Sequence, residues 1–179
     1  MSLNADLTRP LLLLDIDGVV SLFGFSPHAP PAGSFHWIDG IPHFLSSTAA
    51  AHLLALSEIF ELVWCSGWEE RANEYLPTLL GLPAELPYLR FAPAVRATSG
   101  LAGGGVERST RGHWKLEAID AYAGERALAW IDDCLDEACH AWAAARAAPT
   151  LLVQTQANIG IAAEHVDELR RWATATCPS

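Results

Sequence analysis

The chain is most informative at Leu11-Leu12-Leu13-Leu14-Asp15-Ile16-Asp17-Gly18-Val19-Val20, where an apolar run leads into two aspartates and a glycine turn. The apolar run predicts a buried strand, and parallel α/β sheets bind their ligands at the carboxyl ends of such strands. Two buried like charges are costly unless a cation or a reacting group uses them, so Asp15 and Asp17 indicate a metal site. An acidic pair after a strand can also be a solvated turn, and this segment alone does not decide between the two.

Three later segments also place a polar group directly after an apolar run or at a predicted helix start. Leu62–Cys65 precedes Ser66-Gly67, Ala127–Ile131 precedes Asp132-Asp133, and Lys115 opens an amphipathic stretch. Alternating strand and helix patterns predict a parallel sheet with right-handed crossovers, in a Rossmann-like three-layer α/β/α sandwich. The predicted strands span 11–15, 62–65, 127–131 and 150–153, with a short extended piece at about 88–91. The predicted helices span about 48–59, 69–80, 115–123, 135–147 and 162–173.

The order Asp-x-Asp, Ser, Lys, Asp-Asp resembles the haloacid dehalogenase-like (HAD) hydrolase superfamily, over about Leu11 to Trp172. The resemblance implies magnesium-dependent phosphoryl transfer through an aspartyl-phosphate. The second acidic position holds an aspartate, Asp17, and in this the chain resembles the phosphatase members of the superfamily. The resemblance therefore implies a phosphomonoester hydrolase.

The same resemblance implies roles for the acidic residues. Asp15 is the expected nucleophile, and Asp17 is expected to protonate the leaving oxygen and later to accept a proton from water. Mg²⁺ prefers oxygen ligands, and the expected ones are Asp15, Asp132 and the backbone carbonyl of Asp17. Asp133 either contacts the metal through water or orients its neighbours. The sequence leaves open whether Asp132 or Asp133 is the direct ligand.

Ser66, Gly67 and Lys115 are the expected phosphate-binding residues. The Ser66 hydroxyl and the Gly67 amide can reach a phosphate oxygen, and a helix start nearby adds a positive dipole. Ser66 can also be the N-cap of a helix that begins near Trp68. Lys115 supplies a compact positive charge. The alternative is a solvent-facing helix lysine, with Arg108 or Arg111 as the cation.

Two windows that hold cap domains in the superfamily are short here. Phe23–Phe44 is rich in Pro, Gly and aromatic residues, which predicts a small β-flap over about 19–44 and no large cap domain. The second window, 68–114, is largely filled by a helix and loops, including the Gly100–Gly105 loop. This loop lacks a G-x-G-x-x-G pattern, and we interpret it as a mobile linker rather than a phosphate cradle. The expected aromatic residues at the open mouth, suited to stacking or to core packing, are Phe23, Phe25, Phe35, Trp37, Trp68 and Trp114.

The 179-residue length, with 51% hydrophobic and 18% charged residues, predicts one globular domain over 11–175 after a flexible leader at 1–10. The four-leucine run is too short for a membrane span and lacks a signal-cleavage pattern, so a cytoplasmic protein without a membrane partner is expected. The formal net charge of −10 argues against a strong nucleic-acid-binding surface. The sequence leaves the oligomeric state open.

The capless build and the closing segment Thr155–Ile161 are similar to HAD phosphatase domains of RNA-repair proteins. The expected partner is therefore a phosphorylated substrate, either a small molecule or a nucleic-acid end. The alternative function is a catalytically silent HAD-fold binding or regulatory domain. A response-regulator receiver domain is disfavoured because no lone aspartate ends a strand between Asp17 and Ser66, and a second acidic pair closes the motif set.

Overall fold

The computed structural model describes residues 9–82, 85–92 and 113–176. Its central sheet has four parallel strands in the order β5-β1-β6-β7. The strands are β1 (Leu11–Leu14), β5 (Glu61–Trp64), β6 (Leu128–Asp132) and β7 (Thr150–Gln154). The helices are α1 (Ser47–Ser57), α2 (Arg71–Leu80), α4 (Leu116–Ala123), α5 (Glu137–Ala145) and α6 (Ala163–Thr176). The predicted elements therefore form, with ends shifted by at most three residues.

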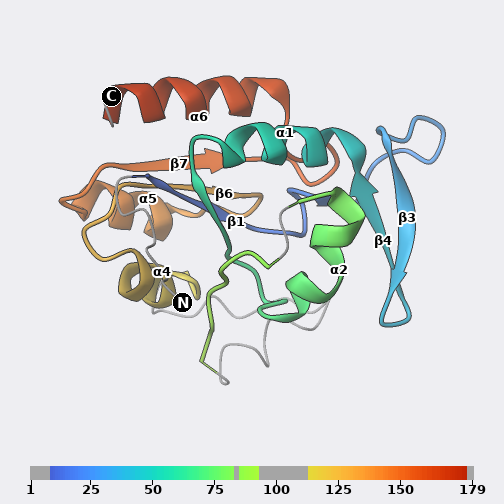
Figure 1. Cartoon of the computed structure of the whole chain (residues 1–179), viewed down its shortest axis with the longest axis horizontal. Helices are drawn as coiled ribbons and strands as arrows, with labels where there is room; N and C mark the ends of the chain where they lie inside the picture. The colour runs from blue at the N-terminus through green and yellow to red at the C-terminus, as the bar shows by residue number, and fades with distance from the viewer. Residues whose placement is uncertain (1–8, 83–84, 93–112, 177–179) are drawn as a thin grey trace.

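Helices cover both faces of this sheet, with α1 and α6 on one side and α4 and α5 on the other (Figure 1). The four leucines of β1 are all fully buried because alternate side chains point into two different cores. Leu12 and Leu14 pack with α1 and α6, whereas Leu11 and Leu13 pack with α4 and α5. The predicted Rossmann-like three-layer sandwich is thus confirmed, and an unbroken apolar strand is what a doubly covered parallel sheet requires.

Between β1 and α1 the chain forms a small antiparallel sheet of β2 (Ser21–Leu22), β3 (Gly33–Ile38) and β4 (Ile41–Ser46). Strands β3 and β4 are joined by Asp39-Gly40, whose φ angles of 51° and 79° are typical of a two-residue type I′ turn. This sheet, which we call the flap, lies beside α2 at one end of the molecule (Figure 1). It confirms the predicted small β-flap.

Two sequence expectations differ in detail from the structure. The extended piece expected at 88–91 is not a full strand, but Tyr88 forms a parallel bridge with Trp64 at the outer edge of β5. The helix expected near Trp68 begins at Arg71, because residues 67–70 form a turn.

The Gly100–Gly105 loop, Arg108, Arg111 and most of the leader at 1–10 lie outside the described residues. Within residues 9–82, 85–92 and 113–176, no helix combines the length and the apolar character that a membrane span requires.

Candidate active site

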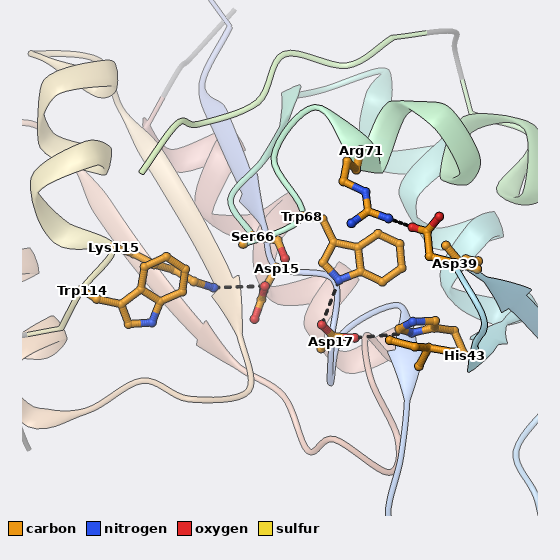
Figure 2. A pocket seen from close by; sticks show the side chains of 12 residues that line it. Asp15, Asp17, Asp39, His43, Ser66, Trp68, Arg71, Trp114 and Lys115 are labelled. Atoms are coloured by element: carbon orange, nitrogen blue, oxygen red, sulfur yellow. Dashed lines mark hydrogen bonds and ion pairs between the residues drawn. The ribbon is translucent and has the colours of Figure 1, made fainter. Parts of the chain in front are cut away.

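Polar side chains gather where the central strands end, around a cavity of about 490 Å³ (Figure 2). Asp15 directly follows β1, and its amide donates to the Ile131 carbonyl of β6 at 3.0 Å. Asp132 is the last residue of β6, and Ser66 lies two residues beyond β5. Because these parallel strands end at one edge of the sheet, residues far apart in sequence meet there. The structure thus brings Asp15, Ser66 and Asp132 together, as predicted.

Lys115, the only lysine in the sequence, connects two of these carboxylates. It directly precedes α4, and only 3% of it is exposed. Its Nζ lies 3.0 Å from Asp15 Oδ1 and 2.6 Å from Asp132 Oδ2. The alternative of a solvent-facing helix lysine is therefore wrong, and Lys115 supplies the fixed positive charge at the base of the cavity.

Three carboxylates form an acidic cluster that can hold a metal ion. Single oxygens of Asp15, Asp132 and Asp133 all lie within 4.8 Å of one another. Metal–oxygen bonds near 2.1 Å place the ligands of an octahedral Mg²⁺ about 3 to 4 Å apart, so this donor set fits the ion in chemistry and spacing. The Asp17 side chain is not a member of this cluster, and its expected contribution to a metal is its backbone carbonyl.

The backbone around the acidic cluster packs closely against its carboxylates and is linked to them by hydrogen bonds. A Cβ on Gly18 would lie 2.4 Å from Asp133 Cγ, and Gly18 also has a φ of +77°, so this position requires glycine. Asp132 Oδ1 accepts the Cys134 amide at 2.9 Å, which fixes the carboxylate in place. Thr155 Oγ1 donates to the Gly18 carbonyl at 2.8 Å, and its amide donates to the Asp132 carbonyl at 3.0 Å. Thr155 therefore joins the two acidic segments, a role that the sequence did not reveal.

The electrostatics of the cluster reflect crowded negative charge. Burial raises the pKa of the Asp15 carboxyl from 3.8 to about 7, against the opposing effect of Lys115, and Asp132 raises it further. Burial also raises the pKa of Asp133, with a further contribution from Asp132. Burial disfavours the charged form of Lys115, but the two carboxylates outweigh this effect and raise its pKa above the usual range. A divalent cation would relieve this repulsion.

Ser66 and Gly67 both line the cavity, where a phosphate oxygen could reach them. Ser66 is buried, and its carbonyl accepts the Glu69 amide at 3.0 Å to close the turn before α2. The interpretation of Ser66 as an N-cap is wrong, because the cap residue of α2 is Glu70, which makes no side-chain capping bond. The full turn between Ser66 and the helix also places the helix dipole farther from the hydroxyl than the sequence predicted.

The Asp17 side chain lies toward Trp68 and His43, whereas Asp15 lies toward Lys115 (Figure 2). Its Oδ2 accepts a hydrogen bond from Trp68 Nε1 at 3.0 Å, and its Oδ1 lies 3.8 Å from His43 Nδ1. The nucleophile and the acid–base residue expected from the sequence therefore have different surroundings. Different surroundings are what two aspartates need if they are to have different roles.

The flap contributes residues that sequence reasoning missed. Ile38, Ile41 and His43 line the cavity, and Asp39 in the turn forms an ion pair with Arg71 of α2. The Asp39 carboxylate also accepts the Tyr75 hydroxyl at 2.9 Å, so the hairpin tip is attached to α2. The Asp-Gly dipeptide was the available signal, because it predicts a hairpin turn at this position.

Of the six aromatic residues expected at the mouth, Trp68 and Trp114 line the cavity in the described part of the chain. Phe25 and Phe35 instead pack against Phe44, with ring centroids 4.6 and 5.0 Å away. Trp37 is 74% exposed on the other face of the flap. The expectation was therefore wrong for most of the set, since the flap turns its larger rings away from the site.

The parallel sheet, the Asp15-x-Asp17 turn at its edge and the buried lysine define a HAD-type hydrolase domain. The family described as the HAD domain in Swiss Army Knife RNA repair proteins matches residues 11–166, and the chain belongs to this family. Both the superfamily resemblance and the similarity to RNA-repair proteins are thereby confirmed. No curated protein matches the chain.

Proposed function

We propose that this protein is a Mg²⁺-dependent phosphomonoester hydrolase that acts through an aspartyl-phosphate on Asp15. The observation that carries the proposal is the cluster of Asp15, Asp132 and half-buried Asp133, with the buried Lys115 between two of its members. Membership of a HAD family supports hydrolase chemistry. The catalytically silent alternative has less support, because burying the carboxylates of Asp15 and Asp132 and the Lys115 ammonium beside a third carboxylate is costly for a purely structural role.

The proposed reaction has two steps. An ionised oxygen of Asp15 attacks phosphorus, and the bond between phosphorus and the leaving oxygen breaks. The leaving oxygen keeps the electron pair of that bond and receives a proton from Asp17. A water molecule then attacks phosphorus and gives a proton to Asp17, the bond to Asp15 breaks, and inorganic phosphate leaves. Lys115 favours the ionised form of Asp15 and offers positive charge to the phosphoryl oxygens. Bound Mg²⁺, held by Asp15, Asp132 or Asp133 and the Asp17 carbonyl, would screen the negative charges that meet in this step.

We propose a nucleotide or a nucleic-acid end phosphate as the substrate class. The family description concerns RNA repair, which supports this class. The cavity also presents Trp68, Trp114, Ile38 and Ile41, which are suited to contact a nucleobase or sugar beside the phosphate. The net charge of −10 favours recognition of an end over tight binding along a strand.

Phosphate release from p-nitrophenyl phosphate, with Mg²⁺ or with EDTA, tests the activity. We expect turnover only with Mg²⁺, and a loss of roughly 10³-fold or more in Asp15→Asn. Asp167→Asn, which removes an exposed carboxylate of α6, is the matched control and should keep wild-type rates. Wild-type rates in Asp15→Asn contradict the proposed nucleophile, and Mg²⁺ binding without turnover favours the silent alternative.

The substrate class needs a separate experiment. Mononucleotides and oligoribonucleotides with a 3′- or 5′-phosphate should be compared with p-nitrophenyl phosphate by kcat/KM. We expect at least one nucleotide substrate to be preferred, with a lower KM from the added contacts. Equal or weaker turnover of every nucleotide removes this class and leaves the phosphatase proposal standing.

A further inference from the structure

The Asp17 carboxyl is contacted on both oxygens by side chains from two separate elements. Trp68, in the turn before α2, donates its Nε1 proton to Oδ2 at 3.0 Å, and His43 of β4 places Nδ1 3.8 Å from Oδ1 (Figure 2). The Asp17 side chain is itself 49% exposed. A short carboxylate with this much exposure can rotate freely unless neighbours hold it, and here it has one neighbour on each oxygen.

The two neighbours also hold each other. The His43 and Trp68 rings meet edge to face, with centroids 4.7 Å apart and an interplanar angle of 71°. His43 Nδ1 lies 3.2 Å from Ser21 Oγ, and the Ser21 carbonyl accepts the Gly18 amide at 2.7 Å. The flap histidine is therefore tied to the same turn that carries Asp17. We call Trp68, His43 and Ser21 the Asp17 clamp.

The chemistry of the clamp assigns different tasks to the two oxygens of Asp17. An indole N–H only donates, so Oδ2 stays a hydrogen-bond acceptor while Trp68 holds it. The proton that Asp17 delivers is then carried on Oδ1, the oxygen on the His43 side. A general acid must lie within hydrogen-bond reach of the atom that it protonates, and small displacements are costly. Fixing Oδ2 therefore aims Oδ1.

We propose that Trp68 and His43 are positioning residues for the acid–base step, Trp68 by anchoring Oδ2 and His43 by limiting the rotation of the carboxyl. The inference rests on the proposed function of Asp17. It makes strand β4 of the flap part of the catalytic machinery, and not only a wall of the cavity.

The test is the dependence of rate on the leaving group in Trp68→Phe, which keeps an aromatic ring and deletes the N–H. Nitrophenolate departs readily without a proton, whereas the alkoxide of glycerol 2-phosphate needs one. The parameter kcat/KM covers the steps up to departure of the leaving group, so it isolates the acid role. We expect kcat/KM for glycerol 2-phosphate to fall about tenfold or more, and that for p-nitrophenyl phosphate to fall less than about twofold.

Three further variants make the comparison specific. Trp37→Phe removes an indole N–H from the outer face of the same flap and should leave both substrates unaffected. His43→Ala should reproduce the selective loss on glycerol 2-phosphate. His43→Asn, which returns a nitrogen near the position of Nδ1, should recover part of it. Thermal unfolding of each variant checks folding, and the histidine pair carries the test if Trp68→Phe does not fold.

An equal loss on both substrates, or no loss on either, in the folded variants overturns the inference. Equal rates in His43→Ala and His43→Asn overturn the part that concerns His43. These outcomes differ from failure of the proposed function, which shows as an absence of Mg²⁺-dependent turnover in the wild type and overturns both proposals.

Discussion

Replacing Lys115 by methionine removes the ammonium between Asp15 and Asp132 and keeps an unbranched side chain that is one atom shorter. Lys115 is buried, and its contacts of 3.0 and 2.6 Å are the shortest that either carboxylate makes with a cation in the described chain. Removing one partner of a buried ion pair leaves the remaining charges without compensation. Lys115→Met should therefore lower the free energy of unfolding strongly.

The magnitude follows from the two distances. At an effective dielectric constant of about 20, each contact contributes a gross Coulomb energy of about 5 to 6 kcal/mol. The cost of burying the ammonium offsets much of this, and a net loss of about 3 to 5 kcal/mol is typical when one partner is removed. For a chain of this length, 1 kcal/mol corresponds to about 2 to 4 °C in Tm, so we expect Tm to fall by roughly 10 °C.

The assay is thermal unfolding of both proteins, first in EDTA and then with millimolar Mg²⁺. The gap between wild type and variant should be largest in EDTA and should narrow with Mg²⁺, because a bound cation replaces part of the missing positive charge. Arg170→Met, which removes an exposed charge from α6, is the matched control for the change in net charge. It should shift Tm by no more than about 2 °C.

Two results would refute this reasoning in different ways. If Lys115→Met has the same Tm as Arg170→Met in EDTA, the buried ion pairs do not stabilise the fold. If the gap is large but Mg²⁺ raises the Tm of neither protein, the acidic cluster is not a magnesium site. The single lysine gives an independent check, since isotope-labelled lysine yields one side-chain signal, and Mg²⁺ should shift it in the wild type.

Three other changes probe the same site. Asp133→Asn removes a carboxylate whose pKa is raised by burial and by Asp132, so stability in EDTA should be equal or higher. Calorimetric titration should show weaker Mg²⁺ binding, and an unchanged affinity would exclude Asp133 as a ligand. Gly18→Ala places a Cβ 2.4 Å from Asp133 Cγ at a φ of +77°, so urea unfolding should show a loss of about 1 to 3 kcal/mol, and full stability would contradict the geometry. In EDTA, burial raises the pKa of Asp15 from 3.8 to about 7, so the folded state binds more protons than the unfolded state and stability should fall as pH rises from about 4 to 7. Asp15→Asn should flatten this slope, and an equal slope in both proteins would assign the titration to another group.

The half of the site that holds the acidic cluster could be predicted because it depends on strand ends. Asp15 and Asp132 each close an apolar run, and parallel strands bring such positions to one edge whatever lies between them. Lys115 was predictable for a similar reason, since it begins a helix that packs on this sheet. The position of Ser66 beside the cavity was predicted, but the turn between Ser66 and α2 was not. A serine is equally suited to the N-cap of a helix and to the start of a longer turn.

The flap half could not be predicted from periodicity. Residues 19–46 contain many Pro, Gly and aromatic residues, so an apolar pattern does not show which side faces the cavity. In a hairpin, a shift of one residue in the pairing moves every side chain to the opposite face. The aromatic residues were therefore expected at the mouth, although Phe35 packs on Phe44 and Trp37 is exposed on the outer face.

The two-residue turn at Asp39-Gly40 resolves this ambiguity and links the flap to the chemistry. It pairs Ile38 with Ile41 and His36 with His43, which sets Ile41 and His43 toward the cavity. With one more residue in the turn, Pro42 or Phe44 would take the place of His43 near Asp17, and neither has an imidazole nitrogen for a hydrogen bond with Ser21. The orientation of Asp17, the proposed acid–base residue, thus depends on a turn about twenty residues away in sequence, whereas the position of Asp15, the proposed nucleophile, depends on the central sheet.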